Sequence, residues 1–158
     1  MTRLAVLSDV HGNLPALEAV LGEIAAQEAP DATWVLGDLA AFCPWPTEAL
    51  ALLRTIPNVA FLQGNTDRYL VTGQRPSALV RSPKDWANMP ALLAERDANF
   101  RWTVERLSFD DYRFLRDLPQ RLEMEVPGYA ASSPFTLPWQ TMRLIFSPTP
   151  PTTRCALL

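Results

Sequence analysis

Short apolar runs alternate with amphipathic stretches over the first 73 residues. The runs at 4–7, 34–36 and 59–62 have the length and composition of strands buried on both faces of a sheet. Between them, residues 14–28 and 47–53 repeat apolar side chains at helical spacing. This order of strand, helix, strand, helix and strand predicts a parallel sheet with right-handed crossovers, and so an α/β fold.

Local signals support the two helices. Asn13 stands where an N-cap is expected, with Pro15 in the first turn, and the helix should end near Pro30. Pro46 and Thr47 are start signals for the second helix.

After residue 73 the pattern changes. Pro76, Pro83 and Pro90 interrupt a polar stretch, and a helix is predicted from residue 90 or 91 to residue 107. The large apolar groups of this helix are Phe100, Trp102, Val104 and Leu107. To the cluster of Phe100 and Trp102 we assign core or interface packing and no chemistry.

The following segment contains a short helix and a strand. Ser108, with Asp111 three residues on, predicts an N-cap and a helix to about Leu118. An outlying strand is predicted from the alternation of Leu122, Met124 and Val126.

Composition narrows the functional classes. The 158 residues are 48% apolar, which suits one globular domain, and the net charge of -3 with a pI near 5.1 implies no general attraction to nucleic acid or to an anionic membrane. Cys43 and Cys155 do not form a disulfide pattern, and no signal peptide or membrane-spanning run is recognised. We therefore expect a cytoplasmic protein with reduced thiols.

Polar clusters follow each of the three predicted strands. They are residues 9–11, 37–38 and 64–67. Because the carboxyl ends of parallel strands open onto one crevice, we expect convergence of Asp9, His11, Asp38 and Asn65. Carboxylate, imidazole and amide oxygen form a hard ligand set that suits Mn²⁺, Fe or Mg²⁺ better than a thiolate-bound structural zinc.

Each cluster also has a purely structural interpretation. Asp9 and His11 can form a helix-entry turn, Gly37 with Asp38 is ordinary turn chemistry, and residues 64–65 both tolerate positive φ in a tight turn. The side chains of Asp67 and Arg68 can also pair with each other or face solvent, with no direct catalytic role. Phe42 and Trp45 either line a substrate pocket or pack their loop onto the core.

Together, residues 8–13, 37–38 and 64–67 resemble the first three motifs of the calcineurin-like metallophosphoesterases in order and spacing. Residues 42–46 and 102–108 are similar to the small bacterial and archaeal phosphodiesterase branch of that family. The resemblance implies a domain over residues 1–126 with a four-layer α+β architecture, a β-sandwich flanked by helices, whose second half is truncated here.

The resemblance also implies a two-metal hydrolase. Asp9 and His11 would hold one ion, Asp38 would bridge both, Asn65 would bind the second, and Asp67 would orient a ligand from behind. Mn²⁺ is the expected ion, with Fe, Zn²⁺, Ni²⁺ and Mg²⁺ as alternatives, and the substrate would be a phosphomonoester or phosphodiester.

One departure from the family pattern changes this expectation. The family completes its centre with a histidine after a later strand and a Gly-His-x-His motif, whereas His11 is the only histidine here. We therefore expect impaired activity. The alternative is a non-catalytic scaffold or binding protein on the same fold. A truncated sandwich would also expose apolar faces, which predicts a homo-oligomer or a tail that covers them.

Residues 127–158 differ in composition from the rest of the chain. They contain six prolines, and no acidic residue follows Glu125. They predict either a disordered tail or a reading-frame slip near Tyr129, since a shifted frame permits an apolar strand ending in a histidine, LLTLH. The DNA sequence across codons 128–158 distinguishes the two hypotheses.

Overall fold

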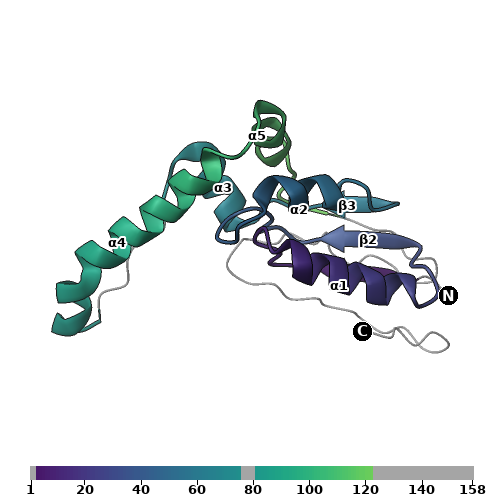
Figure 1. The fold of residues 1–158 in the computed structure, drawn as a ribbon, viewed down its shortest axis with the longest axis horizontal. Helices are drawn as coiled ribbons and strands as arrows, with labels where there is room; N and C mark the ends of the chain where they lie inside the picture. Colours follow the sequence, from purple (N-terminus) through teal and green to yellow (C-terminus); the bar gives the residue numbers. More distant parts are fainter. Residues whose placement is uncertain (1–2, 76–80, 123–158) are drawn as a thin grey trace.

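The structure, a computed structural model, describes residues 3–75 and 81–122. Figure 1 shows the elements in chain order. The strands are β1 (Leu4–Leu7), β2 (Ala32–Val35) and β3 (Val59–Phe61). The helices are α1 (Leu14–Ala25), α2 (Pro46–Leu53), α3 (Asn65–Thr72), α4 (Pro83–Val104) and α5 (Phe109–Arg116).

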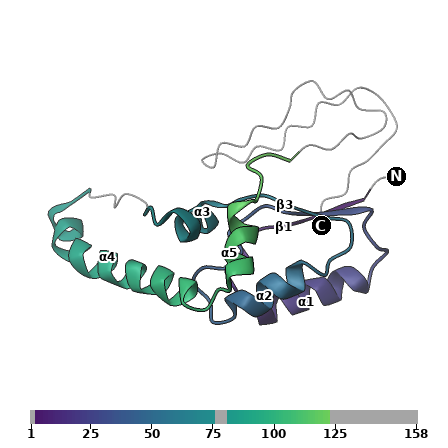
Figure 2. The ribbon, with the colours of Figure 1, turned by 90° about the horizontal axis from the view of Figure 1, so that it is seen from above.

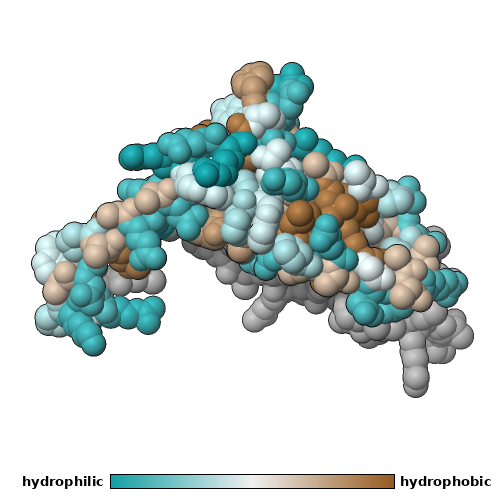
Figure 3. Space-filling model, in the orientation of Figure 1, coloured by the Kyte–Doolittle hydropathy of each residue, from teal (hydrophilic) through white to brown (hydrophobic). Residues whose placement is uncertain are grey.

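The three strands form one parallel sheet in the order β1-β2-β3, which confirms the predicted parallel arrangement. Leu4 pairs with Ala32, and Thr33 pairs with Val59. Helices α1 and α2 lie side by side against one face of this sheet (Figure 2). The core between them includes fully buried Val35 and Leu50. Figure 3 shows an apolar patch over α1 and α2, while the surface of α4 is mainly polar.

The predicted boundaries in this half are correct to within a few residues. Asn13 caps α1 by accepting a hydrogen bond from the Ala16 N–H, although α1 ends at Ala25 and not at 28. Strand β2 begins at Ala32, two residues earlier than predicted, because its backbone pairs with both neighbours there.

Helix α3 was not predicted. It begins directly after the Gly64 N-cap, where the Asp67 carboxylate accepts a hydrogen bond from the Gly64 N–H. Gly73, at φ 71°, ends it in the left-handed conformation that glycine adopts without strain. Residues 64–67 therefore open a helix.

Helix α4 begins at Pro83, seven residues before the predicted start at Pro90. Ser82 supplies the N-cap and Pro83 occupies the first turn, where its missing N–H costs nothing. Pro90 lies inside the helix and was wrongly interpreted as a break. The helix projects from the body of the molecule (Figures 1 and 2), and Phe100 and Thr103 are its buried residues. Phe100 is fully buried, which confirms its predicted packing role.

Helix α5 has the predicted cap, with the Ser108 hydroxyl accepting from the Asp111 N–H and the Asp111 carboxylate accepting from the Ser108 N–H. Most of the predicted strand at 122–126 lies outside the described residues. The described part of the chain contains one sheet, so the second sheet of the expected sandwich is not seen within it. No helix in the described segments is long and apolar enough to cross a membrane.

An ion pair ties α5 to the end of α2. Arg54 Nη2 lies 2.7 Å from Asp111 Oδ1, and Asp111 is 4% exposed. Burial alone would raise the pKa of Asp111, but hydrogen bonds from Ser108 and Arg54 outweigh it and hold the pKa below its ordinary value of 3.8. The ion pair therefore contributes stability that is fully present above the unfolded-state pKa.

An Arg54→Met variant should lose about 2 kcal/mol of unfolding free energy at neutral pH, because a nearly buried carboxylate loses a charged donor. The difference from the parent should shrink as pH falls through the folded-state pKa of Asp111, where the carboxylate is protonated. Urea unfolding between pH 7 and pH 3 measures it. Arg116→Met, which removes an exposed pair with Asp117, is the control and should barely move the midpoint. A constant difference at all pH values would contradict this account.

Candidate metal centre

The loops after β1 and β2 run alongside each other beyond the sheet. The Asp9 N–H donates to the Gly37 carbonyl at 3.2 Å, and the His11 N–H donates to the Asp38 carbonyl at 2.8 Å. The Gly12 N–H donates to the Leu39 carbonyl, also at 2.8 Å. These bonds continue the pairing of β1 with β2 past the last ladder residue and bring the predicted ligands of the two loops together.

Three predicted ligands have left-handed backbone conformations. The φ angles are 58° at Asp9, 51° at His11 and 57° at Asp38. Residues other than glycine adopt this region uncommonly, and such conformations cluster at functional sites where the surrounding structure maintains them. The backbone is thus held in an unusual shape at all three positions.

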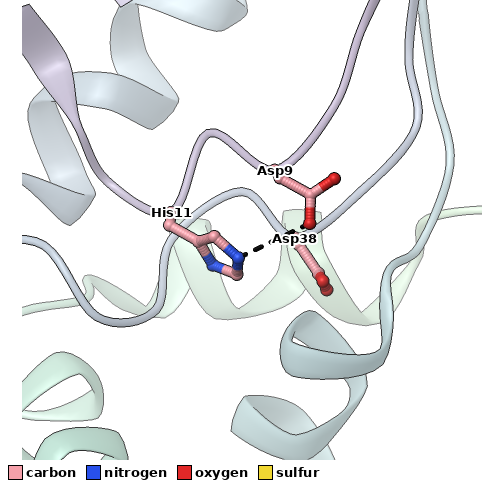
Figure 4. A group of neighbouring side chains, drawn as sticks. All are labelled: Asp9, His11 and Asp38. Atoms are coloured by element: carbon pink, nitrogen blue, oxygen red, sulfur yellow. Dashed lines mark ion pairs between the residues drawn. The ribbon is translucent and has the colours of Figure 1, made fainter. Parts of the chain in front are cut away.

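The side chains of Asp9, His11 and Asp38 converge (Figure 4). Their candidate ligand atoms all lie within 4.8 Å of one another, and His11 Nε2 is 3.6 Å from Asp9 Oδ1. The Asp9 side chain is 66% exposed, whereas that of His11 is 25% exposed. The group is therefore reachable from solvent on the Asp9 side.

The donor set fits a divalent cation. Ligand atoms about 2.0–2.2 Å from one ion are separated from each other by at most about 4.4 Å, so small side-chain rotations bring the three onto a common ion. His11 Nδ1 is buried and has no hydrogen-bond partner among the described residues, so this ring nitrogen is left unsatisfied. Two carboxylates and one imidazole match a hard or borderline ion.

Thr66 fixes the Asp38 carboxylate. Asp38 Oδ1 accepts hydrogen bonds from the Thr66 N–H at 2.9 Å and from the Thr66 hydroxyl at 2.8 Å. Thr66 is the second residue of α3. The partial positive charge at the N-terminus of this helix therefore favours the negative charge of the Asp38 carboxylate. Thr66 had no predicted role. Recognition of a helix start at Gly64 would have indicated that this residue presents a free N–H.

Asp67 lies behind the site. It is fully buried, and its carboxylate accepts hydrogen bonds from the backbone N–H groups of Asp38 at 2.8 Å, Leu39 at 2.8 Å and Gly64 at 2.9 Å. Burial raises the pKa of Asp67 to about 6, against the lowering effect of the N–H groups of Leu39 and Gly64. The interpretation in which Asp67 faces solvent is wrong. Its carboxylate fastens the backbone of two loops to the start of α3.

Gly37 and Gly64 are needed for close approach of the loops. A Cβ at Gly37 would collide with the backbone of Gly64, and a Cβ at Gly64 would collide with the backbone N and carboxylate of Asp38. Gly64 has φ −79°, so the predicted tight turn with positive φ is wrong at this position. Its hydrogen side chain matters because no space exists for a larger one.

Asn65 is the first residue of α3 and is half-buried. It directly precedes Thr66, whose N–H contacts the Asp38 carboxylate. The structure therefore places Asn65 at the same edge of the sheet as the other predicted ligands, and its metal-binding role stays a prediction.

The packing role considered for Phe42 is confirmed, and its role in a substrate pocket stays a prediction. Its φ of 88° is unusual for a bulky residue, and its side chain is partly exposed. The ring lies 5.2 Å from the His11 imidazole and 5.3 Å from the ring of buried Phe100, centroid to centroid. Phe42 therefore packs its loop onto α4 and also lies beside the candidate ligand His11. Trp45 is the N-cap residue of α2 and is 39% exposed.

Two curated proteins are similar to the chain. An uncharacterized protein, MJ0912, of Methanocaldococcus jannaschii is 30% identical over 125 residues, which are 79% of this chain and 45% of that protein. The symmetrical bis(5'-nucleosyl)-tetraphosphatase of Serratia proteamaculans is 33% identical over 67 residues, which are 42% of this chain and 24% of that protein.

Two solved structures share the fold. A metallophosphoesterase from Sphaerobacter thermophilus has 32% identity and a TM-score of 0.56, over 78% of this chain and 44% of that chain. The hypothetical protein PH1004 from Pyrococcus horikoshii has 25% identity and a TM-score of 0.59, over 75% of this chain and 48% of that chain. This chain spans less than half the length of each of the four proteins.

The family model described as calcineurin-like phosphoesterase matches residues 2–146. The matched range contains all three polar clusters, and the described elements have the fold of the two solved structures. The chain is a member of the calcineurin-like phosphoesterase family.

Proposed function

We propose that this chain carries the first half of a divalent-metal phosphoesterase centre, and that it acts on phosphodiesters or phosphomonoesters. The observation that carries this proposal is the convergence of two carboxylates and one imidazole within 4.8 Å, at the carboxyl edge of a parallel sheet. Family membership supports hydrolysis of a phosphoester as the reaction.

Each residue has a proposed role. Asp9, His11 and Asp38 would hold one ion. Asp38 and Asn65 would hold a second ion, and the Asn65 role rests on the resemblance to the family. Asp67 positions the backbone of Asp38 and does not contact the ion. When bound, a divalent ion supplies Lewis-acid polarisation of the phosphate and lowers the pKa of water. Mn²⁺ is the first candidate, ahead of Fe, Zn²⁺, Ni²⁺ and Mg²⁺.

Mn²⁺ should bind the 158-residue chain weakly and at close to one ion per chain, because the other family histidines are not among its residues. Isothermal titration measures it. Replacement of Asp38 by Asn should weaken binding at least about tenfold, since the carboxylate is a proposed ligand. Glu18→Gln, on the exposed surface of α1, is the matched control and should bind like the parent. Equal Mn²⁺ affinity of the parent and the Asp38→Asn variant would contradict the assignment.

The single histidine also favours the second candidate, a scaffold or binding protein on the same fold. Hydrolysis of a chromogenic phosphodiester with added Mn²⁺ separates the two. Slow, Mn²⁺-dependent turnover that Asp38→Asn abolishes supports an impaired enzyme, and no turnover despite Mn²⁺ binding supports the scaffold. Turnover as fast as that of a complete family enzyme would refute the idea that the missing histidines limit activity.

The remaining expectations belong to the same proposal. We assign residues 1–126 to the phosphoesterase-like domain and 127–158 to an aberrant tail, and we propose cytoplasmic location and self-association. Sedimentation of the purified chain tests the last of these, with a monodisperse monomer as the contrary result.

A further inference from the structure

A hollow lies between the loop after β2 and helix α4. Its volume is about 370 Å³, which falls in the range of small-molecule sites, roughly 300–1,000 Å³. The loop contributes Phe42 and Pro44, and α4 contributes Glu95, Asn99 and Trp102. Phe42 is shared with the candidate metal centre, because the same ring contacts the His11 imidazole.

The lining of the hollow suits an aromatic ring better than a phosphate. Phe42 and Trp102 offer aromatic surface, and none of the described residues that line the hollow is a lysine or arginine. Glu95 is its charged lining residue, and a carboxylate repels an anion. A phosphate would thus be held at the metal centre, and an uncharged part of the same molecule would occupy the hollow.

Both aromatic side chains pack against a neighbouring side chain. The Phe42 ring packs against buried Phe100, and its backbone adopts a φ of 88° that a bulky residue rarely adopts. The guanidinium of Arg106 lies 3.6 Å from the centre of the Trp102 ring. Rigid aromatic surfaces bind a stacked ring with little loss of side-chain entropy.

The polar residues favour a ring with hydrogen-bonding edges. Asn99 carries an amide that can donate to and accept from a base edge, as asparagine does with adenine, and Glu95 carries a carboxylate that accepts from amino groups. Both lie one to two helical turns from Trp102 along α4.

We propose that this hollow binds the nucleobase of a nucleoside phosphoester whose phosphate lies at Asp9, His11 and Asp38. The inference rests on the proposed phosphoesterase function and names the substrate class for it. Phe42 is then a specificity residue that links the base site to the metal centre.

The test compares ligands with and without a base on the full chain in Mn²⁺. Adenosine 5′-monophosphate should bind at least about fivefold more tightly than ribose 5-phosphate, the gain expected of one stacked base. Phe42→Gly and Trp102→Leu should each reduce this ratio toward one. Glycine is chosen at Phe42 because it adopts positive φ without strain. Trp86→Ala, a 66% exposed residue of the same helix outside the hollow, should leave the ratio unchanged.

Two further ligands separate the ways in which the inference can fail. Phenyl phosphate should bind more weakly than adenosine monophosphate, and equal affinity would overturn the assignment to a nucleobase. Adenosine, which carries no phosphate, should bind the parent chain more tightly than it binds the Phe42→Gly variant, even in the absence of Mn²⁺. If Mn²⁺ does not bind but adenosine shows this difference, the phosphoesterase proposal fails and the base site stands. The base site is overturned if the parent binds adenosine 5′-monophosphate and ribose 5-phosphate with similar affinity, or if both variants keep the parent's affinity ratio. Either result holds whether or not Mn²⁺ binds.

Discussion

A Gly64→Ala variant should lose about 3 kcal/mol or more of unfolding free energy. The new methyl group would clash with the backbone N and the carboxylate of Asp38, and both groups are held in place by hydrogen bonds. The Asp38 N–H donates a hydrogen bond to the Asp67 carboxylate, and the Asp38 carboxylate accepts one from the Thr66 hydroxyl. Overpacking against fixed backbone typically costs about 1–3 kcal/mol, and here hydrogen bonds must break as well. Urea unfolding followed by tryptophan fluorescence measures the loss.

The chain contains a matched control for this variant. Gly22 lies within α1, and a Cβ there would have no other atom within 4 Å. Gly22→Ala should therefore gain about 0.5–1 kcal/mol from improved helix propensity. Equal effects of the two substitutions would show that the loops do not approach as closely as described. A Gly64→Ala chain that does not fold, beside a folded Gly22→Ala chain, is the extreme form of the expected result.

Replacement of Asp67 by Asn should cost about 2–3 kcal/mol and weaken Mn²⁺ binding. The carboxylate accepts three backbone N–H groups through two oxygens, whereas an amide has one oxygen and would direct an NH₂ group toward a donor. At least one buried N–H then lacks an acceptor, which costs about 1–3 kcal/mol, and the charge-assisted character of the others is lost. Because the loop of Asp38 shifts, Mn²⁺ affinity should fall by about tenfold or more.

Asp110→Asn is the isosteric control for Asp67→Asn. The Asp110 side chain is 79% exposed, and its contact with Arg113 is a surface ion pair within α5. The unfolding midpoint and the Mn²⁺ affinity of the Asp110→Asn variant should match those of the parent. If Asp67→Asn behaved like this control, the fastening role of Asp67 would be refuted.

The sequence predicted the elements whose signals are local. Asn13, Pro46 and Ser108 mark helix starts by their side-chain chemistry, and the three apolar runs predicted a parallel sheet. Pro90 misled the prediction because a proline is usually a helix breaker, whereas the Ser82 cap starts α4 well before it.

The contacts around the candidate site could be predicted only in part. The convergence of Asp9, His11 and Asp38 follows from parallel topology, and the structure brings these three together. The resemblance placed Asp67 behind the ligands, but two of its three partners could not be predicted, because they are backbone N–H groups 28 and 29 residues away that carry no sequence signal. The same holds for the glycines, whose close approach depends on tertiary packing.

Hydrogen bonds link the three loops that bear the candidate ligands, and a single buried carboxylate makes the link between the second and the third. Each loop follows a different strand, yet the first is hydrogen-bonded to the second and Asp67 ties the second to the third. Opening any one of them exposes the partners of the others, so they form one cooperative unit. Assembly of the centre is then inseparable from folding of the sheet, and a cation that binds only the assembled loops stabilises the whole domain by mass action.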